Sequence, residues 1–318
     1  MELAEQSGRP AFRIDAMSVH CYATLYFRDL RECRSWIMRC LALYREAGGE
    51  NLSYPVPNDA ATAALAILPT VEWLLGDSAA TESAIQDGLR HVDRPNREFD
   101  KAYIHAWIAG VRFTQRRYAQ SRDAAQKALE IGQRHGFREW YVTGFLIDRL
   151  AQAAMQPSPV ALKEAYDTCM ELAVQGVGLN ASWYLWALAR GYKVAGQDQI
   201  AAQLIEQGFL RAAASAETRM NAELLIAKAE LAPDDAVAVE LLQSALEMAD
   251  GQGAVANSLR AAAALVTRIS GEPAAADLAR STLELLEGQG DYPAQAGWMA
   301  QRLETLRQAL KSSHAVRV

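Results

Sequence analysis

The sequence predicts an all-α protein, a right-handed superhelical solenoid of about seven helical hairpins followed by a C-terminal capping helix. Three observations lead to this fold class. Apolar residues recur with a helical period along almost the whole chain, and alternating strand patterns are nearly absent. The helices come in pairs, and the second helix of several pairs ends in a similar phrase. The pairs repeat at intervals of about 37 to 48 residues, which is the range of helical-hairpin solenoids.

The phrase at the end of the second helices sets the frame of the repeats. It reads CLALYREAGG (40–49), ALEIGQRHGF (128–137), CMELAVQGVG (169–178) and ALEMADGQGA (245–254). Breaks inside the pairs fall at LLGDS (74–78), VAGQD (194–198), LAPDD (231–235) and ISGEP (269–273). Glycine supplies the left-handed residue that ends a helix, and Asp or Pro opens the next one. The alignment predicts one repeat domain over residues 1–311, with units starting near residues 14, 62, 102, 143, 182, 219 and 257.

The two ends of the chain differ in this frame. MELAEQSGRP (1–10) reads like the end of a second helix whose first helix is missing, so we expect no N-terminal cap. AQAGWMAQRLETLRQALK (294–311) is predicted to form the capping helix, and residues 312–318 a polar tail. This asymmetry favours the interpretation that the sequence is the C-terminal portion of a larger protein. Pro69, inside the first helix of the second unit, is expected to kink or shorten that helix.

The units resemble tetratricopeptide repeats, which place small residues at positions 8, 20 and 27 and bulky ones at 4, 7, 11 and 24. The fifth unit matches well, at Leu185, Leu188, Ala189, Tyr192, Gly196, Ala201, Ile205 and Gly208. Four cysteines occupy small-residue positions of this frame, namely Cys21, Cys33, Cys40 and Cys169. A free cysteine packs like a small apolar residue, so packing is favoured over a redox or metal role. The third unit reads QRRY (115–118) in place of the glycine turn, which we interpret as a solvated turn.

The long unit, its ALE-containing phrase and its first helices rich in Trp and Tyr resemble the C-terminal repeats of large bacterial signalling ATPases. Some of these carry an N-terminal adenylate/guanylate cyclase domain, and others are transcription activators with a terminal helix-turn-helix. The resemblance covers about residues 1–311 and implies a regulatory module beside an ATPase or cyclase domain. The chain has no G-x-x-x-x-G-K-[ST] phosphate loop and nothing resembling a cyclase metal site, so those activities are not transferred.

NASWYLWALARGYKVAGQ (180–197) carries the main candidate binding residues on one predicted helix. Leu185, Leu188, Ala189 and Tyr192 form its packing stripe, because residues three, four and seven apart share a helix face. A second stripe consists of Trp183, Trp186, Arg190 and Lys193. In tetratricopeptide arrays the first helices line a concave groove, and these four residues occupy its positions.

Two interpretations of this second stripe stay open. Leaving two large aromatic side chains in water forgoes roughly 4–6 kcal/mol each, so they need a cover. Adjacent first helices could cover them, and Trp186→Ala would then be strongly destabilising. Alternatively, they form an aromatic floor, with Arg190 and Lys193 binding a carboxylate or phosphate. In that case replacing Trp186 and Arg190 by alanine would abolish partner capture and leave thermal stability almost unchanged.

Equivalent groove positions in other units give a surface of mixed charge, at Asp15, Ser18, Tyr22, Tyr103, Trp107, Asp148, Glu223, Glu230 and Arg268. Such a surface suits an extended peptide or a helix of a partner protein. It suits nucleic acid poorly, and the net charge of −6 also disfavours binding to a phosphate backbone. No apolar run approaches the roughly 20 residues that span a bilayer, and no signal peptide is visible, so we expect a cytoplasmic protein.

The sequence contains no catalytic signature, and we predict no enzyme activity, no cofactor and no metal site. HExxH, G-x-S-x-G and paired histidines at ligand spacing are missing. His20 and His105 fall at packing positions, whereas His91, His135 and His314 fall at helix ends or in the tail, where capping or solvation suffices. Asp234 and Asp235 open a helix and favour its dipole.

Three functional hypotheses remain. The first is a protein-interaction or sensor module of a bacterial signalling system, which binds a protein or peptide partner in its groove. The second is a small-molecule enzyme built in the groove, which would require Asp148, His105 and Arg190 to converge in a deep pocket. The third is the repeat region of a transcription activator without its DNA-binding domain.

Overall fold

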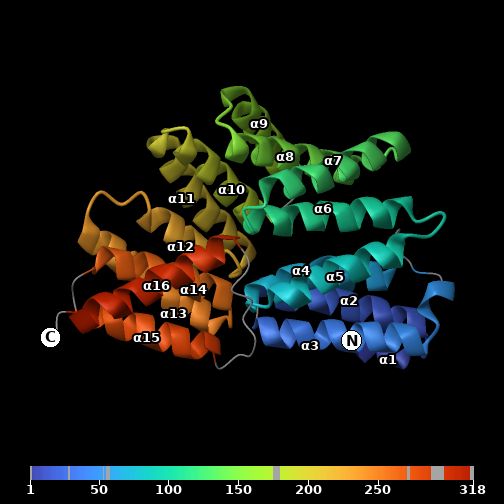
Figure 1. Ribbon diagram of the computed structural model, residues 1–318. Coiled ribbons are helices and arrows are strands. Elements are labelled where there is room, and N and C mark those ends of the chain that lie inside the picture. The colour runs from blue at the N-terminus through green and yellow to red at the C-terminus, as the bar shows by residue number, and fades with distance from the viewer. Residues whose placement is uncertain are drawn as a thin grey trace. The chain divides into compact units, whose positions relative to one another are not determined.

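The computed structural model describes residues 2–27, 29–52, 54, 58–174, 180–270, 273–287 and 297–315. Within these residues the chain forms helices α1 to α16 and one short 3-10 helix, with no strand (Figure 1). The predicted all-α class is confirmed. None of the described helices is long and apolar enough to span a membrane.

The chain divides into two compact units. The N-terminal unit consists of residues 1–73 and 79–177, and the C-terminal unit of residues 74–78 and 178–318. The prediction of one repeat domain over residues 1–311 therefore stays a prediction, and each unit is described by itself.

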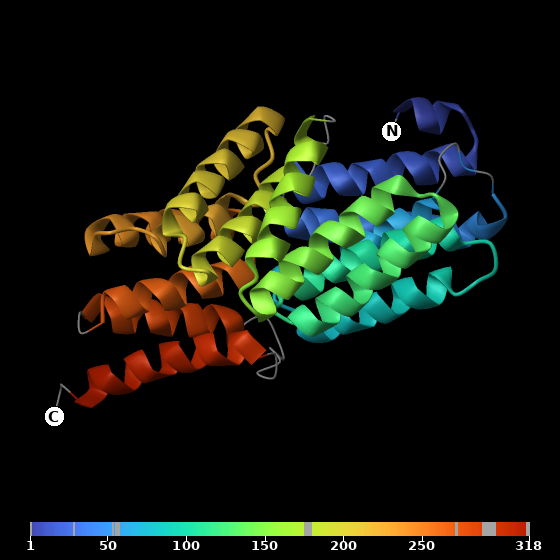
Figure 2. The same cartoon turned by 90° about the horizontal axis from the view of Figure 1, so that it is seen from above.

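The N-terminal unit is a series of helices joined by short connections. Its helices are α1 (Glu2–Gln6), α2 (Pro10–Phe27), α3 (Leu30–Glu46), α4 (Ala60–Leu74), α5 (Ser78–Val92), α6 (Glu98–Thr114), α7 (Tyr118–His135), α8 (Arg138–Met155) and α9 (Pro159–Val174), with the 3-10 helix at Gly49–Asn51. Helix α6 packs against α7, α7 against α8, and the first helices α6 and α8 also touch each other (Figure 2). Helix α4 continues through Pro69 and does not end there.

The C-terminal unit repeats this arrangement. Its helices are α10 (Ala181–Val194), α11 (Asp198–Ser215), α12 (Asn221–Ala229), α13 (Asp235–Gly251), α14 (Val255–Arg268), α15 (Pro273–Glu287) and α16 (Gly297–Ala315). Each helix contacts the next along the chain, and the first helices form a series of contacts from α10 to α12, α14 and α16. Asp234 caps α13, as predicted, because its side chain accepts from the backbone N–H groups of Ala236 and Val237.

Helix α16 takes the place of the predicted capping helix. It contacts α14 and α15, and it continues to Ala315, beyond the predicted end at residue 311. Residues 294–296 of the predicted cap and residues 316–318 of the predicted tail lie outside the described residues.

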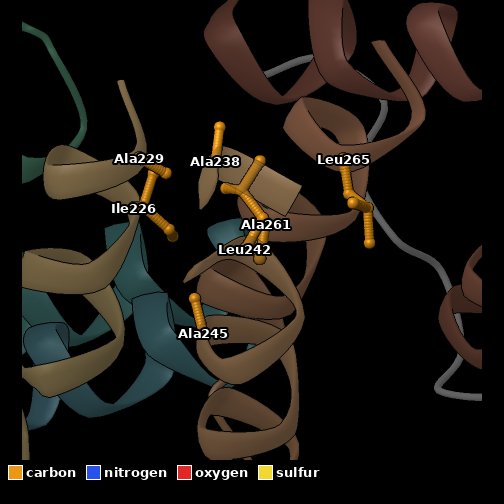
Figure 3. Close-up of a cluster of buried hydrophobic side chains, with 7 residues drawn as sticks. All are labelled: Ile226, Ala229, Ala238, Leu242, Ala245, Ala261 and Leu265. Atoms are coloured by element: carbon orange, nitrogen blue, oxygen red, sulfur yellow. The ribbon is translucent and has the colours of Figure 1, made fainter. Parts of the chain in front are cut away.

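The packing inside the C-terminal unit shows why small residues recur in the sequence. A buried cluster joins α12, α13 and α14 (Figure 3) and consists of Ile226, Ala229, Ala238, Leu242, Ala245, Ala261 and Leu265. Ala238, Ala245 and Ala261 are fully buried. An alanine at such a contact lets two helices approach closely, while the leucines fill the space beside it. The small-residue positions of the frame are therefore helix contacts.

The cysteines occupy similar contacts in the N-terminal unit. Cys21, Cys33 and Cys40 are completely buried, and Cys169 is nearly so. The Cys33 Sγ donates to the backbone carbonyl of Cys21 at 3.3 Å. Burial raises the pKa of the Cys33 thiol to about 11, so this thiol stays protonated and unreactive near neutral pH. The cysteines are buried as the repeat frame predicts.

The QRRY turn differs from its interpretation as a solvated loop. Gln115 is buried and accepts from Arg112 at 2.9 Å, while Arg117 forms an ion pair with Glu82 of α5 at 2.6 Å. Arg116 takes the left-handed conformation, with φ of 59°, that glycine adopts in other turns. The turn is closed by ion pairs to Glu82, whose pKa is lowered first by the hydrogen bond from Arg112.

A buried polar network in the N-terminal unit centres on Asp59, just before α4. Its carboxylate accepts from the Tyr44 hydroxyl at 2.6 Å and pairs with Arg97 at 3.1 Å. His91 Nε2 lies 3.5 Å from the same carboxylate, and the His91 ring packs edge-on against Tyr44. The sequence predicts that capping or solvation suffices for His91 at the end of α5, but its side chain is only 12% exposed and lies beside the buried Asp59 carboxylate. A position near a helix end does not reveal a buried carboxylate contributed by the residue that precedes another helix.

Candidate binding site

The predicted binding stripe of α10 divides into a buried aromatic half and a more exposed basic half. The exposed fractions of Trp183 and Trp186 are 6% and 2%. Their ring centroids lie 6.3 Å apart, and α10 packs against α11 and α12. Arg190 and Lys193 are half-buried. The indole rings therefore pack inside the protein, as one of the two interpretations requires, and only the basic side chains reach solvent.

Arg190 is held in place by the tryptophan beneath it. Its Cζ lies 5.4 Å from the centroid of the Trp186 ring, within the range of a cation–π contact. Its Nη1 is buried, and no hydrogen-bond partner for this atom exists in the described part of the chain. The guanidinium is thus positioned and retains an unused donor.

Lys193 connects α10 to the end of α12. Its Nζ donates to the Glu230 backbone carbonyl at 3.0 Å and to the Glu230 carboxylate at 3.1 Å. Burial raises the pKa of Glu230, but the positive charges of Arg260, Arg190 and Lys193 outweigh it, and the net result is a lowered pKa. Glu230 therefore stays ionised among basic side chains from several helices.

Arg260 brings α14 into this site, and α16, which carries Arg302, packs against α14. Arg260 forms a buried ion pair with Glu223 of α12, and its Nη2 lies 4.0 Å from Glu230 Oε1. Burial lowers the pKa of Arg302, and the charges of Arg260 and Arg190 lower it further, whereas Glu230 raises it. We call Arg190, Lys193, Arg260 and Arg302, with Glu223 and Glu230, the basic cluster.

The sequence frame identified part of the basic cluster and missed Arg260 and Arg302. Arg260 falls at position 4 of the unit that starts near residue 257, where the repeat usually has a bulky apolar residue. The presence of a charged residue at this packing position is the feature of the sequence that could have indicated a role for Arg260 in a charged site. Arg302 lies in the capping helix, outside the repeat frame, and no spacing rule connects it to the others.

Three predicted groove residues of the N-terminal unit form an aromatic cluster. The hydroxyls of Tyr22 and Tyr103 form a hydrogen bond, and the Tyr22 ring packs edge-on against Trp107 at 5.7 Å. Tyr103 also stacks on Trp140 of α8, with ring centroids 4.5 Å apart. Burial raises the pKa of the Tyr103 hydroxyl. Tyr22, Tyr103 and Trp107 therefore join α2 and α6, and Trp140, which the frame missed, extends the cluster to α8.

Two of the acidic groove candidates, Asp148 and Glu223, are buried and paired with arginine. Asp148 accepts from Arg122 at 2.9 Å and from Gln126 at 3.1 Å, both on α7. Glu223 accepts from Arg260. Their carboxylates are occupied within the fold, and partner binding by either residue stays a prediction.

Both histidines at packing positions, His20 and His105, are partly buried. His20 packs edge-on against Trp36, with ring centroids 4.4 Å apart. Burial lowers the pKa of His105 to about 4, with a smaller contribution from the charge of Lys127. No group of three or more His, Cys, Asp or Glu side chains suited to a metal ion occurs among the described residues.

The shift of His105 predicts an acid-sensitive fold. Between about pH 6.5 and pH 4 the unfolded chain binds a proton at this histidine and the folded chain does not, so the free energy of unfolding falls as the pH drops. The expected contribution of His105 is up to about 3 kcal/mol. Urea unfolding at several pH values should show a shallower pH dependence for His105→Gln than for the unchanged chain. An equal pH dependence of the free energy of unfolding in the two proteins would contradict the lowered pKa of His105.

Comparisons with known proteins define the fold and leave the family open. No family model and no curated protein matches the sequence. The crystal structure of NprR in complex with its cognate peptide NprX is similar, with a TM-score of 0.56 and 13% identity, over 96% of this chain and 89% of that one. The apo form of the quorum sensor NprR from B. thuringiensis gives a TM-score of 0.51 and 13% identity, over 92% and 80% of the two chains. The fold is a tetratricopeptide-like solenoid of helical hairpins.

Proposed function

We propose that this solenoid is a regulatory sensor module that binds a peptide, or a peptide segment of a partner protein, and catalyses no reaction itself. The observation that carries the proposal is the basic cluster, where Lys193 of α10 and Arg260 of α14 lie beside Glu230 at the end of α12. A fold shared with NprR, which has been crystallised with a cognate peptide, supports this choice of ligand.

The chemistry of the cluster suits a peptide better than a nucleic acid. It combines basic groups with the carboxylates of Glu223 and Glu230, which would repel a run of phosphates. A peptide offers both acceptors and donors along its backbone and can match such a mixture. Seven extended residues span about 23–25 Å. Four adjacent helices at a spacing of about 8–10 Å have a similar width.

We also propose that the module acts beside an ATPase or cyclase domain, either in one polypeptide or as a separate partner. The resemblance of the repeat phrase to the C-terminal repeats of bacterial signalling ATPases supports this context. Binding of a peptide would then bias the neighbouring domain between two states. The coding sequence next to this chain tests the context, because an adjacent ATPase or cyclase reading frame is the expected finding.

The peptide proposal predicts selective capture by the purified chain. The full chain, immobilised and offered a pool of random heptapeptides, is expected to enrich a small set of sequences, identified by mass spectrometry. A synthetic copy of the most enriched peptide should bind in titration calorimetry and raise the melting temperature, because a ligand that binds the folded state stabilises it. The heat-unfolded chain provides the control. Equal recovery from folded and unfolded protein would contradict the proposal.

A further inference from the structure

One side of α2 in the N-terminal unit carries an apolar row that faces away from the core. The row, which we call the α2 stripe, consists of residues three or four positions apart, namely Phe12, Ala16, Val19, Ala23 and Phe27. The opposite side of α2 is buried and includes Ile14, Met17, Cys21 and Leu25. Helix α2 is therefore apolar on two sides, and one of them is already packed inside its unit.

The α2 stripe is accessible to a partner. The exposed fractions of Phe12, Val19 and Phe27 are 38%, 63% and 42%, and the two alanines between them are half-buried. Single exposed apolar residues are common on protein surfaces, but a contiguous apolar row indicates a contact surface. The small alanine side chains allow a second helix to approach closely, as Ala238 and Ala261 do inside the C-terminal unit. The shape of the stripe therefore suits a helix.

The order of residues in the α2 stripe indicates which helix covers it. From either end, the stripe reads Phe, Ala, Val, Ala, Phe. An antiparallel second α2, related by a two-fold axis near Val19, places Phe12 opposite the partner's Phe27. The same axis places Ala16 opposite the partner's Ala23, so bulky residues meet at the ends and small ones beside the centre. A two-fold contact uses the same surface on both copies and requires this self-complementarity.

The charges beside the α2 stripe favour the antiparallel direction. Arg9 and Arg13 are exposed at the N-terminal end of α2, where the positive end of the helix dipole disfavours a cation. The last turn of α2 has no basic residue, and the next two residues, Arg28 and Asp29, have opposite charges. The C-terminal end of α2 therefore keeps its partial negative charge. An antiparallel partner brings its two N-terminal arginines to this end, where the dipole favours them.

We propose that the α2 stripe is the contact surface of a symmetric dimer, in which α2 packs antiparallel against α2 of a second copy of this chain. The two-fold axis passes near Val19. The contact covers the exposed phenylalanines of both copies and places Arg9 and Arg13 of each copy at the end of the other copy's α2. The proposal does not depend on peptide binding, because the α2 stripe belongs to the N-terminal unit and the basic cluster to the C-terminal unit.

Sedimentation velocity of the full chain at micromolar concentrations tests the surface. The chain is expected to form a dimer that dissociates on dilution. Val19→Glu should raise the dissociation constant about tenfold or more, because it brings two carboxylates together in an apolar contact. Leu210→Glu on α11 is the matched control, since Leu210 is also exposed but lies in the C-terminal unit, and it should leave the constant unchanged. Melting temperatures show that both variants are folded.

Cysteine cross-linking tests the direction of the two helices. The native cysteines are buried, so a cysteine introduced in the α2 stripe is the reactive one. With copper phenanthroline as the oxidation catalyst, Val19→Cys is expected to form a disulfide with its own copy across the two-fold axis. Phe12→Cys and Phe27→Cys should each stay uncross-linked alone and form a disulfide when the two variants are mixed. A disulfide between two molecules of Phe12→Cys would show a parallel pair and contradict the proposal.

Arg13→Glu tests the contribution of charge. This change places a negative charge beside the negative end of the partner's helix, so the dissociation constant should rise severalfold, and more at low salt than at high salt. A tighter dimer of Arg13→Glu would contradict the antiparallel arrangement. A chain that stays monomeric at every concentration would overturn the proposal, as would a dimer with the same dissociation constant before and after Val19→Glu.

Discussion

Replacing Asp59 with alanine is expected to lower the free energy of unfolding of the N-terminal unit by about 3–5 kcal/mol. The Asp59 side chain is completely buried, and Tyr44, His91 and Arg97 all direct polar atoms toward it. Removal of the carboxylate leaves the Arg97 charge partly buried beside Asp100 and leaves the Tyr44 hydroxyl without its acceptor. Removal of one partner of a buried ion pair destabilises a protein by more than the intact pair stabilises it, because the other charge then stays buried without a partner.

Asp59 also has a local role, which adds to the expected loss. Its Oδ1 accepts from the backbone N–H of Ala61 at 2.8 Å, at the start of α4, and its own N–H donates to Asp100 of α6 at 3.1 Å. One residue therefore caps a helix and connects consecutive hairpins through α3, α4, α5 and α6. The hydrogen bonds that hold Asp59 come from residues far apart in the sequence.

Urea unfolding of Asp59→Ala and Asp87→Ala tests this prediction. Asp87 is a matched control on α5, because its ion pair with Arg90 is exposed and contributes at most about 1 kcal/mol. Asp59→Asn keeps an acceptor for Tyr44 but loses the charge, so it should fall between the two alanine variants. Equal stability of Asp59→Ala and Asp87→Ala would show that the network contributes little.

The lowered pKa of Asp59 makes the free energy of unfolding depend on pH under acidic conditions. Burial raises this pKa, but the hydrogen bonds from His91 and Tyr44 lower it, and the net pKa lies below that of a free aspartate. Since the folded-state pKa is lowered, the stabilisation is present above the unfolded-state pKa of about 3.9 and is lost as the pH falls through the folded-state value. Asp59→Asn should therefore flatten the stability profile only below about pH 4, whereas His105→Gln acts between about pH 4 and 6.5.

The sequence predicted the hairpins accurately because their signals are local. The period of apolar residues and the turn residues at Gly196 and Asp234 depend only on neighbours along one or two helices. The first helices of the C-terminal unit start at Ala181, Asn221 and Val255, close to the predicted starts near 182, 219 and 257. Local propensity and global fold agree in these segments.

The charged sites were less predictable because their partners lie one or more hairpins away. Arg260 and Glu223 are separated by 37 residues, and only the packing of α14 against α12 brings their charges together. The sequence predicts a solvated QRRY turn because no residue near it in the sequence indicates that Glu82 is the partner of Arg117. A helical period identifies the face on which a side chain lies, but it does not identify the helix that covers this face.

For the tryptophans of α10, too, the helical period did not show which helices cover them. Their burial leads to the second large prediction. Trp186→Ala is expected to lower the free energy of unfolding of the C-terminal unit by about 3–5 kcal/mol, the range for truncation of a buried aromatic side chain. Only 2% of Trp186 is exposed, and α10 packs against both α11 and α12, so the cavity would open where these helices meet.

Leu210→Ala on α11 is the control for Trp186→Ala, because Leu210 is 70% exposed and its truncation should change stability by no more than about 0.5 kcal/mol. Unfolding by guanidinium measures both variants. Loss of the Trp186 ring also removes the support beneath Arg190, so any peptide should bind Trp186→Ala more weakly even where the variant stays folded. Near-normal stability of Trp186→Ala would instead place the ring in a ligand-facing position. The structure thus predicts that Trp186 affects peptide binding through Arg190, as a packed support for a half-buried guanidinium.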